Sequence, residues 1–368
     1  MAERYLVTGG AGFVGSHIVG ALRAEGHDVV VIDSRCRPGE TETVELLEGV
    51  EYVWADLNDD LEVRRALRDV DVVVHQAAMV GVGQSMFEID RYVGANVGGT
   101  ASLLQAVVET GHVRKIVMAS SMSVYGEGLY HCTECGNVRP DHRSEDRLAA
   151  RRWEQSCPRC GRDVVPVPIT EEEFLQPTSV YGASKRSQEE LCLVVGRAYG
   201  IPTTCFRYFG IYGDGQLLTN PYTGIVSMFA ARLVNGKPPL VFEDGQQLRD
   251  LVHVDDVCTA VLAACEHPTL SGSFNLASGD PVTVEQVARI LAQEVAPDIA
   301  PEISSRYRKG DIRHCYGDPG RFAAEVGWKA TVPLEDGLRG TARWASEHRQ
   351  PEAIDQMRAE LASRSLLI

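Results

Sequence analysis

Short runs of β-branched and other apolar residues alternate with helix-like segments over the first 120 residues of the chain. Such apolar runs are typical of strands that are buried on both faces of a sheet. Because helix-like segments such as Ser16 to Glu25 lie between the runs, the pattern predicts βαβ units and a doubly wound parallel sheet, which is an α/β fold. The expected strands contain Tyr5 to Val7, Val29 to Ile32, Val72 to His75 and Ile116 to Met118.

The alternation breaks after residue 127, where a polar, Arg-rich stretch with four cysteines begins. We interpret this stretch as an inserted module, because a strong helical pattern follows it. Farther along, Gly- and Pro-rich segments alternate with helices, which predicts a smaller C-terminal lobe with some elements that return to the sheet. The predicted division is 1–127 for the first part of the sheet domain, 128–170 for the insert, 171–207 for the rest of the sheet domain and 208–360 for the lobe. A helix from Ser184 to Tyr199 is expected in the rest of the sheet domain, and helices from Ile225 to Asn235 and from Val284 to Val295 are expected in the lobe.

Composition and charge restrict the class of protein. The hydrophobic fraction of 44% and the charged fraction of 24% are ordinary for a globular protein, and no apolar stretch reaches the roughly 18 residues of a membrane span. A formal net charge of −15 argues against nucleic acid or an anionic membrane as a partner, although local arginines could still bind an anionic small molecule. Since Met1 to Arg4 lead directly into the first expected strand and leave no room for a signal peptide, we expect a soluble, cytoplasmic protein.

A glycine motif marks the first strand-to-helix turn. Gly9, Gly12 and Gly15 lie at this turn, and Asp33 closes the second expected strand about twenty residues farther on. Glycines there let the backbone approach a pyrophosphate, while the Asp33 carboxylate can accept hydrogen bonds from a ribose and would repel a 2′-phosphate, which favours NAD over NADP. A glycine triplet alone also fits a flexible turn that binds nothing. With strand, helix and aspartate in place, the motif predicts a dinucleotide-binding Rossmann domain.

Further cofactor candidates follow other strands of the predicted sheet. Asp56 and Leu57 end a strand-like segment and are placed to meet the adenine, and small residues after His75 permit close approach of the cofactor. Each of these positions taken alone also fits ordinary packing. The candidate cofactor-binding residues are Gly9, Gly12, Phe13, Val14, Gly15, Asp33, Asp56, Leu57, Gln76, Ala77, Ala78, Asn96, Tyr181 and Lys185.

The strongest chemical pattern in the chain is a tyrosine followed four residues later by a lysine. On a helix this spacing puts Tyr181 and Lys185 on one face, where the ammonium group and a positive nicotinamide ring favour the phenolate and so provide a base near neutral pH. The segment from Ser120 to Ser123 follows an expected strand, and a hydroxyl there can move a proton between a substrate oxygen and Tyr181. A solvated helix pair is the alternative interpretation, which the glycine motif and the strand-end serine make the weaker one.

Together these residues resemble the extended short-chain dehydrogenase/reductase family, in particular its NAD-dependent sugar-nucleotide epimerases and dehydratases, over most of the chain. The resemblance is carried by Thr8 to Gly15, Ser121 to Gly126, Tyr181 to Lys185, Arg207 to Phe209 and Leu248 to Val257. Within the family, three segments resemble the dTDP-L-rhamnose 4-epimerases most: Val80 to Met86, Tyr125 to Tyr130 and Asn220 to Gly224. After Arg207 to Phe209 the family usually carries an asparagine that contacts a substrate phosphate, whereas here Gly210 follows, so that contact is not expected.

The resemblance also implies roles for individual residues. Tyr181 would be the base, Lys185 its activator and a ribose ligand, and Ser121 the proton relay. Arg249 and Arg313 would hold the nucleotide diphosphate, for which a planar bidentate donor is suited. Further candidate substrate contacts are Gln84, Ser123 and Tyr222. A homodimer through two helices of each subunit, Gly98 to Thr110 and Ser184 to Tyr199, is implied as well.

The residues after Ser121 help to choose among the reactions of this family. Dehydratases that resemble this chain carry an Asp-Glu pair there for the elimination of water, but here Met122 and Ser123 stand in those places. Without that acid and base, the expected reaction is NAD-dependent 4-epimerisation of a dTDP- or UDP-hexose through a transient 4-keto sugar. The alternatives are a 4,6-dehydratase, a 4-keto reductase, or an inactive protein that only senses nucleotides.

Two Cys-x-x-Cys-Gly segments lie in the predicted insert. Residues 136–156 separate them, which makes 21 residues, slightly more than the roughly 15–20 that are usual. Four thiolates arranged by two such turns predict a closed, structural zinc site that takes no part in the sugar chemistry. A pair of disulfides fits a cytosolic protein less well, and a redox switch is a further alternative. The predicted ligands are Cys132, Cys135, Cys157 and Cys160.

Overall fold

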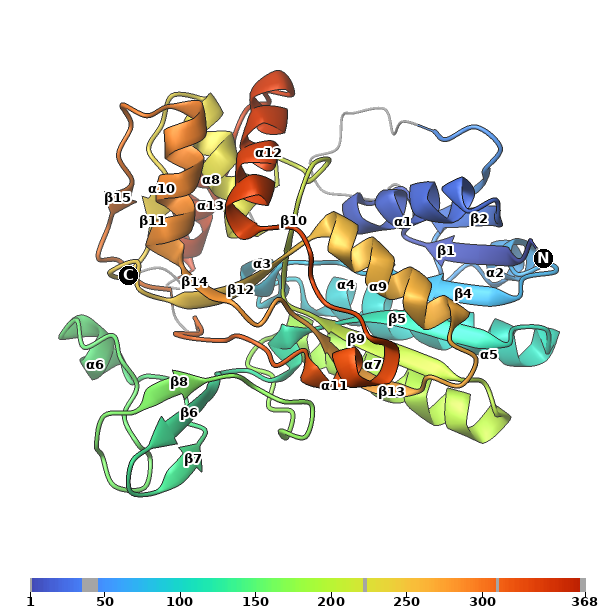
Figure 1. Cartoon of the computed structure of the whole chain (residues 1–368), viewed down its shortest axis with the longest axis horizontal. Coiled ribbons are helices and arrows are strands. Elements are labelled where there is room, and N and C mark those ends of the chain that lie inside the picture. Colours follow the sequence, from blue (N-terminus) through green and yellow to red (C-terminus); the bar gives the residue numbers. More distant parts are fainter. Residues whose placement is uncertain (1, 35–45, 221–223, 309–310, 365–368) are drawn as a thin grey trace.

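A computed structural model describes residues 2–34, 46–220, 224–308 and 311–364. Its centre is a seven-stranded sheet in which every pair of neighbouring strands is parallel, in the order β13-β9-β5-β4-β1-β2-β3 (Figure 1). The strand order reverses between β1 and β4, so the prediction of a doubly wound α/β fold is confirmed. The strands are β1 Arg4–Thr8, β2 Asp28–Asp33, β3 Glu51–Trp54, β4 Val72–His75, β5 Lys115–Ser121, β9 Thr203–Tyr208 and β13 Gly272–Leu276.

Helices cover both faces of this sheet, which explains why its strands are apolar without alternation. Tyr5 and Val7 of β1 join a core beneath α1 and α9, whereas Leu6 points into a second core beneath α2, α5 and α7. In the ranges that the structure describes, no helix is long and apolar enough to cross a membrane. The covering helices are α1 Phe13–Ala24, α2 Asp60–Ala66, α5 Gly99–Thr110, α7 Val180–Tyr199, α9 Val254–Glu266 and α11 Gly320–Val326.

Short helices follow β4 and β5 at the carboxyl ends of these strands. A π-helical turn leads directly into α5, and a single 3₁₀ turn follows the last residue of β5. These segments supply residues near the predicted catalytic positions. They are α3 Val82–Ser85, α4 Ile89–Tyr92, the π-helix Val93–Gly98 and the 3₁₀ turn Met122–Val124.

The C-terminal part of the chain forms a second lobe above the carboxyl edge of the sheet, while β13 and α11 return to the sheet (Figure 1). Its core lies among α8, α10 and α12. Helix α10 spans the residues that its pattern predicts, because Thr283 and Gln286 form a capping box at its start. The elements are β10 Gly210–Tyr212, α8 Ile225–Val234, β11 Leu240–Val241, β12 Leu248–His253, β14 Pro281–Thr283, α10 Val284–Val295, β15 Glu302–Ile303, α12 Leu334–Glu347 and α13 Ile354–Ser363.

The segment between β5 and α7 forms a small unit of its own, centred on an antiparallel sheet in the order β7-β6-β8. It projects from one end of the molecule, on the side where the C-terminal lobe also lies (Figure 1). The two Cys-x-x-Cys segments lie beside this sheet, at residues 132–135 and 157–160. The elements are β6 Leu129–Cys132, β7 Gly136–Val138, α6 Glu145–Ala149 and β8 Val165–Val167.

Candidate active site

A cavity of about 560 Å³ lies between the carboxyl edge of the sheet and the C-terminal lobe. Its volume falls within the range of small-molecule binding sites, and its place at the strand-order reversal is where α/β folds bind ligands. Most of the predicted site residues line it. These are Gly9, Gly12, Phe13, Val14, Gly15, Asp33, Asp56, Leu57, Gln76, Ala77, Ala78, Gln84, Ser121, Ser123, Tyr181, Lys185 and Arg249.

The glycine turn leaves no room for side chains. Gly9 has a φ of 67°, and a Cβ on it would lie 2.8 Å from backbone atoms of Ala77. A Cβ on Gly15 would lie 2.1 Å from the carbonyl oxygen of Gly9. Helix α1 therefore starts tightly against the end of β1, with no acidic residue in its first turn. Its first N–H groups are available to an anion.

Two polar side chains shape the walls next to this turn. The Asp33 carboxylate at the end of β2 accepts a hydrogen bond from the Ala11 N–H at 3.1 Å. The Gln76 side-chain oxygen accepts a hydrogen bond from the Tyr208 hydroxyl at 3.2 Å, while its buried amide nitrogen has no hydrogen-bond partner among the residues that the structure describes. An unsatisfied buried donor is costly unless a ligand accepts from it. The residues around the turn thus fit a dinucleotide that carries a diphosphate and hydroxyl groups.

A buried polar network supports this wall from below, and sequence analysis missed it. His75 bonds to the Thr8 hydroxyl at 2.7 Å and to the Thr100 hydroxyl at 2.8 Å, and Thr8 also accepts from the Ala77 N–H at 3.1 Å. Burial, with repulsion from Lys185 as the second cause, lowers the pKa of His75 to about 3. His75 is therefore neutral at ordinary pH, and it fixes the chain next to the glycine turn.

Helix α7 begins at the cavity and presents its first turns to it. The Ser179 hydroxyl caps the helix by accepting from the Gly182 N–H at 3.0 Å, and the Ser85 hydroxyl accepts from the Tyr181 N–H at 3.0 Å. Tyr181 and Lys185 lie one turn apart and are 8% and 3% exposed. The predicted pairing of these two side chains on one helix face at a ligand cavity is thus present in the fold.

Burial shifts the pKa values of both members of this pair. Burial raises the pKa of Tyr181, whereas its hydrogen bond with Ser121 lowers it. Burial also lowers the pKa of Lys185 to about 8, although Cys192, Cys205 and Glu189 act in the opposite direction. Desolvation therefore opposes the charged form of both side chains.

Ser121 stands at the end of β5, directly beside this pair. Its hydroxyl accepts from the N–H of Ser123 at 3.2 Å, within the 3₁₀ turn that also brings Met122 to the cavity. Among the described residues around the cavity, the only carboxylates belong to Asp33, which ends β2, and Asp56, which follows β3. Three steps between neighbouring strands separate β5 from β2, or about 14 Å. No carboxylate of the described lining is thus available next to Ser121.

Two predicted site residues lie elsewhere. Asn96 is buried behind the wall, where its amide donates to the Ser184 hydroxyl at 2.9 Å and to the Met79 carbonyl at 3.1 Å. Arg313 is 0% exposed and is not among the residues of the cavity wall, because carboxylates of the insert and of the C-terminal lobe surround its guanidinium group. The expectation that Arg313 holds a diphosphate is therefore corrected. Tyr222 lies outside the described residues.

Comparison with known proteins identifies the family. The sequence profile of the NAD dependent epimerase/dehydratase family matches residues 5–145 and 158–277. The chain belongs to this family. It is 35% identical to a dTDP-L-rhamnose 4-epimerase of Burkholderia thailandensis over 94% of this chain and 95% of that protein.

Solved structures agree with this assignment to the epimerase/dehydratase family. A UDP-glucose 4-epimerase of Thermotoga maritima with UDP-glucose is 30% identical, with a TM-score of 0.77 over 94% of this chain and 99% of that one. A Thermus thermophilus UDP-glucose 4-epimerase in complex with NAD is 30% identical, with a TM-score of 0.73 over 93% and 98% of the two chains. The prediction of a nucleotide-sugar epimerase, and hence of an isomerase, is confirmed.

The family profile passes over residues 146–157, which lie inside the insert. Near this stretch the sulfur atoms of four cysteines lie within 4.8 Å of one another, and those of Cys132 and Cys160 are 3.6 Å apart. No disulfide joins cysteines of the described part of the chain. The predicted clustering of Cys132, Cys135, Cys157 and Cys160 is thus present in the fold.

A buried ion pair behind the active site is a second feature that sequence analysis missed. Glu189 of α7 is 2% exposed and accepts from Arg207 of β9 at 2.7 Å, from the Ser120 hydroxyl at 2.6 Å and from the Ser273 hydroxyl at 2.6 Å. It thereby ties the catalytic helix to β5, β9 and β13. A charged residue four positions after Lys185 looks in sequence like any solvated helix position, so only packing reveals its role.

Proposed function

We propose that this chain is an NAD-dependent 4-epimerase of a hexose carried on a nucleoside diphosphate, either dTDP or UDP. The observation that carries the proposal is the grouping of Ser121, Tyr181 and Lys185 on one cavity wall where no carboxylate of the described lining lies beside them. This set can remove and return a proton at a carbinol, but it lacks the acid and base that elimination of water would require.

The roles of the three residues follow from their positions. Tyr181 takes the proton of the C4 hydroxyl and later returns one, and Ser121 relays that proton across the hydrogen bond between them. Lys185 adds a positive charge one helical turn away. The 4-keto sugar turns over on its diphosphate anchor between the two halves of the reaction, so the product keeps all of its atoms.

NAD fits the other half of the cavity. Gly9, Gly12 and Gly15 with the start of α1 would hold its diphosphate, Asp33 a ribose, and the unpartnered amide of Gln76 a further acceptor. When bound, NAD accepts the C4 hydride and gives it back, and its positive ring favours ionisation of the tyrosine. A 2′-phosphate would meet the Asp33 carboxylate, so we propose NAD rather than NADP.

The charges of the wall favour a neutral sugar. Lys185 and Arg249 are the cationic side chains among the described residues that line the cavity. With Lys185 used at the reaction centre and Arg249 at the diphosphate, the described lining offers no cation for a carboxylate at C6. We therefore propose a hexose that carries no carboxylate, and Gln84 and Ser123 as its polar contacts.

The test is to incubate the purified protein with dTDP- and UDP-hexoses without added NAD and to follow the products by NMR. Inversion at C4 is the expected result. Loss of water would assign a 4,6-dehydratase, net consumption of added NADH would assign a 4-keto reductase, and absence of turnover with all the sugars would favour the nucleotide-sensing alternative. A UDP-hexuronate that turned over as well as the neutral sugars would overturn the proposed substrate class.

We also propose that the four cysteines bind one structural zinc ion. Four sulfur ligands at about 2.3 Å in a tetrahedron stand about 3.8 Å apart, close to the 3.6 Å between Cys132 and Cys160. Elemental analysis should find one zinc per chain, and Cys132→Ser should lose it whereas Cys258→Ser, a change of a buried cysteine outside the cluster, should keep it. A metal-free protein with two disulfides would contradict the proposal.

The remaining proposals concern assembly and compartment. Helices α5 and α7 lie against each other, and Val194 and Tyr199 of α7 are each 60% exposed. Exposed apolar groups on such a helix pair are suited to association with the same pair of a second copy. We propose a homodimer through α5 and α7, in a reducing compartment such as the cytoplasm, where four free thiols can hold zinc.

A further inference from the structure

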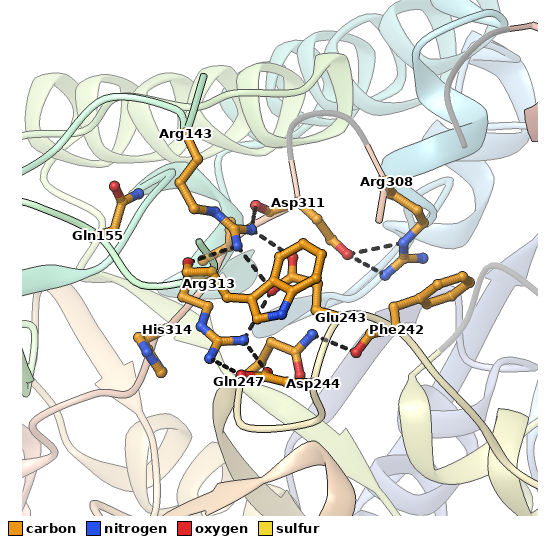
Figure 2. A network of polar contacts seen from close by, with 12 residues as sticks. Arg143, Gln155, Phe242, Glu243, Asp244, Gln247, Arg308, Asp311, Arg313 and His314 are labelled. Atoms are coloured by element: carbon orange, nitrogen blue, oxygen red, sulfur yellow. Dashed lines mark hydrogen bonds and ion pairs between the residues drawn. The ribbon is translucent and has the colours of Figure 1, made fainter. Parts of the chain in front are cut away.

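The insert is fastened to the C-terminal lobe by buried charges rather than by apolar contacts alone. The guanidinium group of Arg143 in the insert donates two hydrogen bonds to the carboxylate of Glu243 in the lobe, at 2.9 Å and 2.7 Å, and each of the two side chains is 2% exposed. Arg143 also donates to the Asp311 carbonyl at 3.0 Å. Figure 2 shows the side chains of Arg143 and Arg313 converging on Glu243.

Arg313 completes this contact from the lobe side. Its Nη1 donates to Glu243 at 2.9 Å and to Asp244 at 2.7 Å, its Nη2 donates to Asp244 at 3.0 Å, and its Nε donates to Glu154 of the insert at 3.0 Å. The second hydrogen of Nη2 also goes to Glu154. All five donors of the guanidinium group are therefore used by carboxylates. Arg313 is a fixed link between the insert and the lobe.

Glu127, at the root of the insert, fixes the backbone of the same segment. Its carboxylate accepts from the N–H groups of Arg313 at 3.1 Å and His314 at 3.4 Å. Within the insert, the Tyr130 hydroxyl donates to it at 2.9 Å and the Gln155 amide at 3.1 Å. One buried carboxylate thus joins the insert to two successive peptide groups of the lobe.

The approach of the two parts at this point is close. A Cβ on Gly128 would lie 2.1 Å from the carbonyl oxygen of His314. His314 in turn accepts a hydrogen bond from the Leu248 N–H at 3.0 Å through Nδ1, so its Nε2 carries the proton that is donated to Glu154 at 2.8 Å. The insert therefore also reaches the strand β12, next to Arg249.

The segment 311–314, which the insert contacts, also accepts hydrogen bonds from Arg249 of β12. The guanidinium group of Arg249 donates to the carbonyls of Arg313 at 2.9 Å and Ile312 at 2.7 Å, and to that of Leu248 at 2.8 Å. Arg249 is the one arginine among the described residues around the cavity. Two of its three carbonyl partners thus belong to residues whose position depends on contacts with the insert.

We propose that the four-cysteine insert positions Arg249 for the nucleotide diphosphate, through Glu127, Arg143 and Glu154 acting as positioning residues on the segment 311–314. The inference rests on the proposed zinc site and on the proposed role of Arg249. The insert then serves substrate binding while its metal stays away from the reacting carbon. Because Tyr181 and Ser121 lie on other elements, weaker positioning should raise KM and leave kcat nearly unchanged.

The first test compares two matched changes within the insert. Glu154→Gln removes the charge that faces Arg313, at a side chain that is 54% exposed, so folding should survive. Glu134→Gln removes a similarly exposed glutamate that pairs with Arg162 at the surface. We expect Glu154→Gln to weaken binding of UDP and dTDP in calorimetry and to raise KM roughly tenfold, with kcat within about twofold, and Glu134→Gln to change neither.

The second test follows the segment itself without measuring activity. Zinc is removed from the full-length protein with a chelator, and hydrogen–deuterium exchange is compared between peptides that cover 311–314 and peptides from α1. The amides of Arg313 and His314 should exchange at least about tenfold faster once Glu127 is released, whereas α1 should be unchanged. Equal loss of protection in α1 would mean that the metal holds the whole fold and would overturn the inference.

The two tests separate this inference from the proposed function. If UDP and dTDP fail to bind the unmodified protein, the proposed substrate class is wrong, while the exchange experiment still measures the coupling. If both nucleotides bind with unchanged affinity after zinc removal and in Glu154→Gln, the insert does not position Arg249 and the inference is wrong.

Discussion

Tyr181 lies in a desolvated part of the cavity wall, so its pKa depends on its surroundings. Burial raises its pKa, and the hydrogen bond with Ser121 works against that effect. A ligand that brings positive charge into the cavity, as the proposed oxidised nicotinamide would, acts on this pKa in the same direction as the hydrogen bond.

The simplest prediction for a single residue concerns the hydroxyl group of Tyr181. Tyr181→Phe keeps the ring and its packing but removes the proton acceptor, so turnover should fall by about 100- to 10,000-fold. Tyr199→Phe, at the exposed end of the same helix, is the matched control and should behave like the unmodified protein. NMR of the sugar product measures both, and unchanged turnover in Tyr181→Phe would refute the proposed mechanism.

Gly15 gives a second prediction, because its lack of a side chain is a steric requirement. In Gly15→Ala the new Cβ would stand 2.1 Å from the Gly9 carbonyl, so the turn must shift and NAD retention should be lost, with a destabilisation of about 1–3 kcal/mol. Gly20→Ala in the same helix meets only Leu47 at 3.9 Å and should be neutral or slightly stabilising. The NAD content and Tm of the two purified variants check this, and equal NAD content would contradict it.

His75 makes the free energy of unfolding depend on pH. The unfolded chain binds a proton on this histidine near pH 6.5, whereas the folded protein resists it until about pH 3. The free energy of unfolding should therefore fall as pH drops from 6.5, by up to about 1.4 kcal/mol per pH unit from this residue. Urea unfolding gives the free energy of unfolding at each pH between 7 and about 4.5. The slope of this free energy against pH should be smaller in His75→Gln than in the control His112→Gln, which changes an exposed histidine. Identical slopes would exclude His75 as the cause.

At the scale of elements, the catalytic helix α7 is held to the sheet by charge as well as by apolar packing. Glu189 and Arg207 are 2% and 5% exposed, and the pair joins α7 to the strand next to the one that ends in Ser121. Any error in the seating of α7 would move Tyr181 relative to Ser121. The ion pair thus ties α7 to the sheet, although neither of its residues is among the described residues that line the cavity.

Because this ion pair is buried, we expect that neutralising one of its charges lowers the stability of the fold strongly. Glu189→Gln leaves the Arg207 guanidinium buried without a counter-charge, so the free energy of unfolding should fall by about 3–5 kcal/mol. The control is Glu190→Gln, at the next residue of α7, which breaks an exposed ion pair with Arg186. It should lower the free energy of unfolding by less than about 0.5 kcal/mol. Denaturant unfolding of both variants measures the difference, and similar values would show that the buried pair contributes little.

At the scale of the whole molecule, three parts of the chain meet around one cavity. The sheet supplies the glycine turn and Ser121, the C-terminal lobe supplies Arg249, and the insert contacts Arg313, whose carbonyl accepts a hydrogen bond from Arg249. Figure 1 shows the insert at the end of the molecule, on the side of that lobe and away from β1 and β2. Cofactor binding should therefore tolerate changes in the insert that substrate binding does not.

The proposed dimer is tested at the same scale. Val194→Glu places a charge at an exposed apolar position of α7, so it should shift the protein toward monomer in analytical ultracentrifugation. Val165→Glu changes an equally exposed valine of the insert and should leave the association state as it was. A monomer in the unmodified protein, or a dimer that survives Val194→Glu, would place the contact elsewhere or exclude it.

The sequence by itself determined the sheet, the cofactor turn and the catalytic pair, because each depends on local rules. Buried parallel strands need continuous apolar runs, a close backbone approach needs glycine at Gly9 and Gly15, and a spacing of four residues puts Tyr181 and Lys185 on one helix face. The predicted start of α7 at Ser184 was late, because its cap is Ser179, whereas the predicted starts of α8 and α10 match the structure. Capping contacts are hard to recognise within a polar stretch.

Only the tertiary structure decided which charged residues line the cavity and which are buried in ion pairs. Arg249 and Arg313 look alike in sequence, but one lines the cavity and the other is enclosed by Glu154, Glu243 and Asp244, which lie 69 to 159 positions away along the chain. Such partners meet through folding, and local periodicity carries no record of them. For the same reason the sequence predicted the four-cysteine insert, while its hydrogen bonds to the segments around Glu243 and Arg313 appear only when three distant parts of the chain pack together.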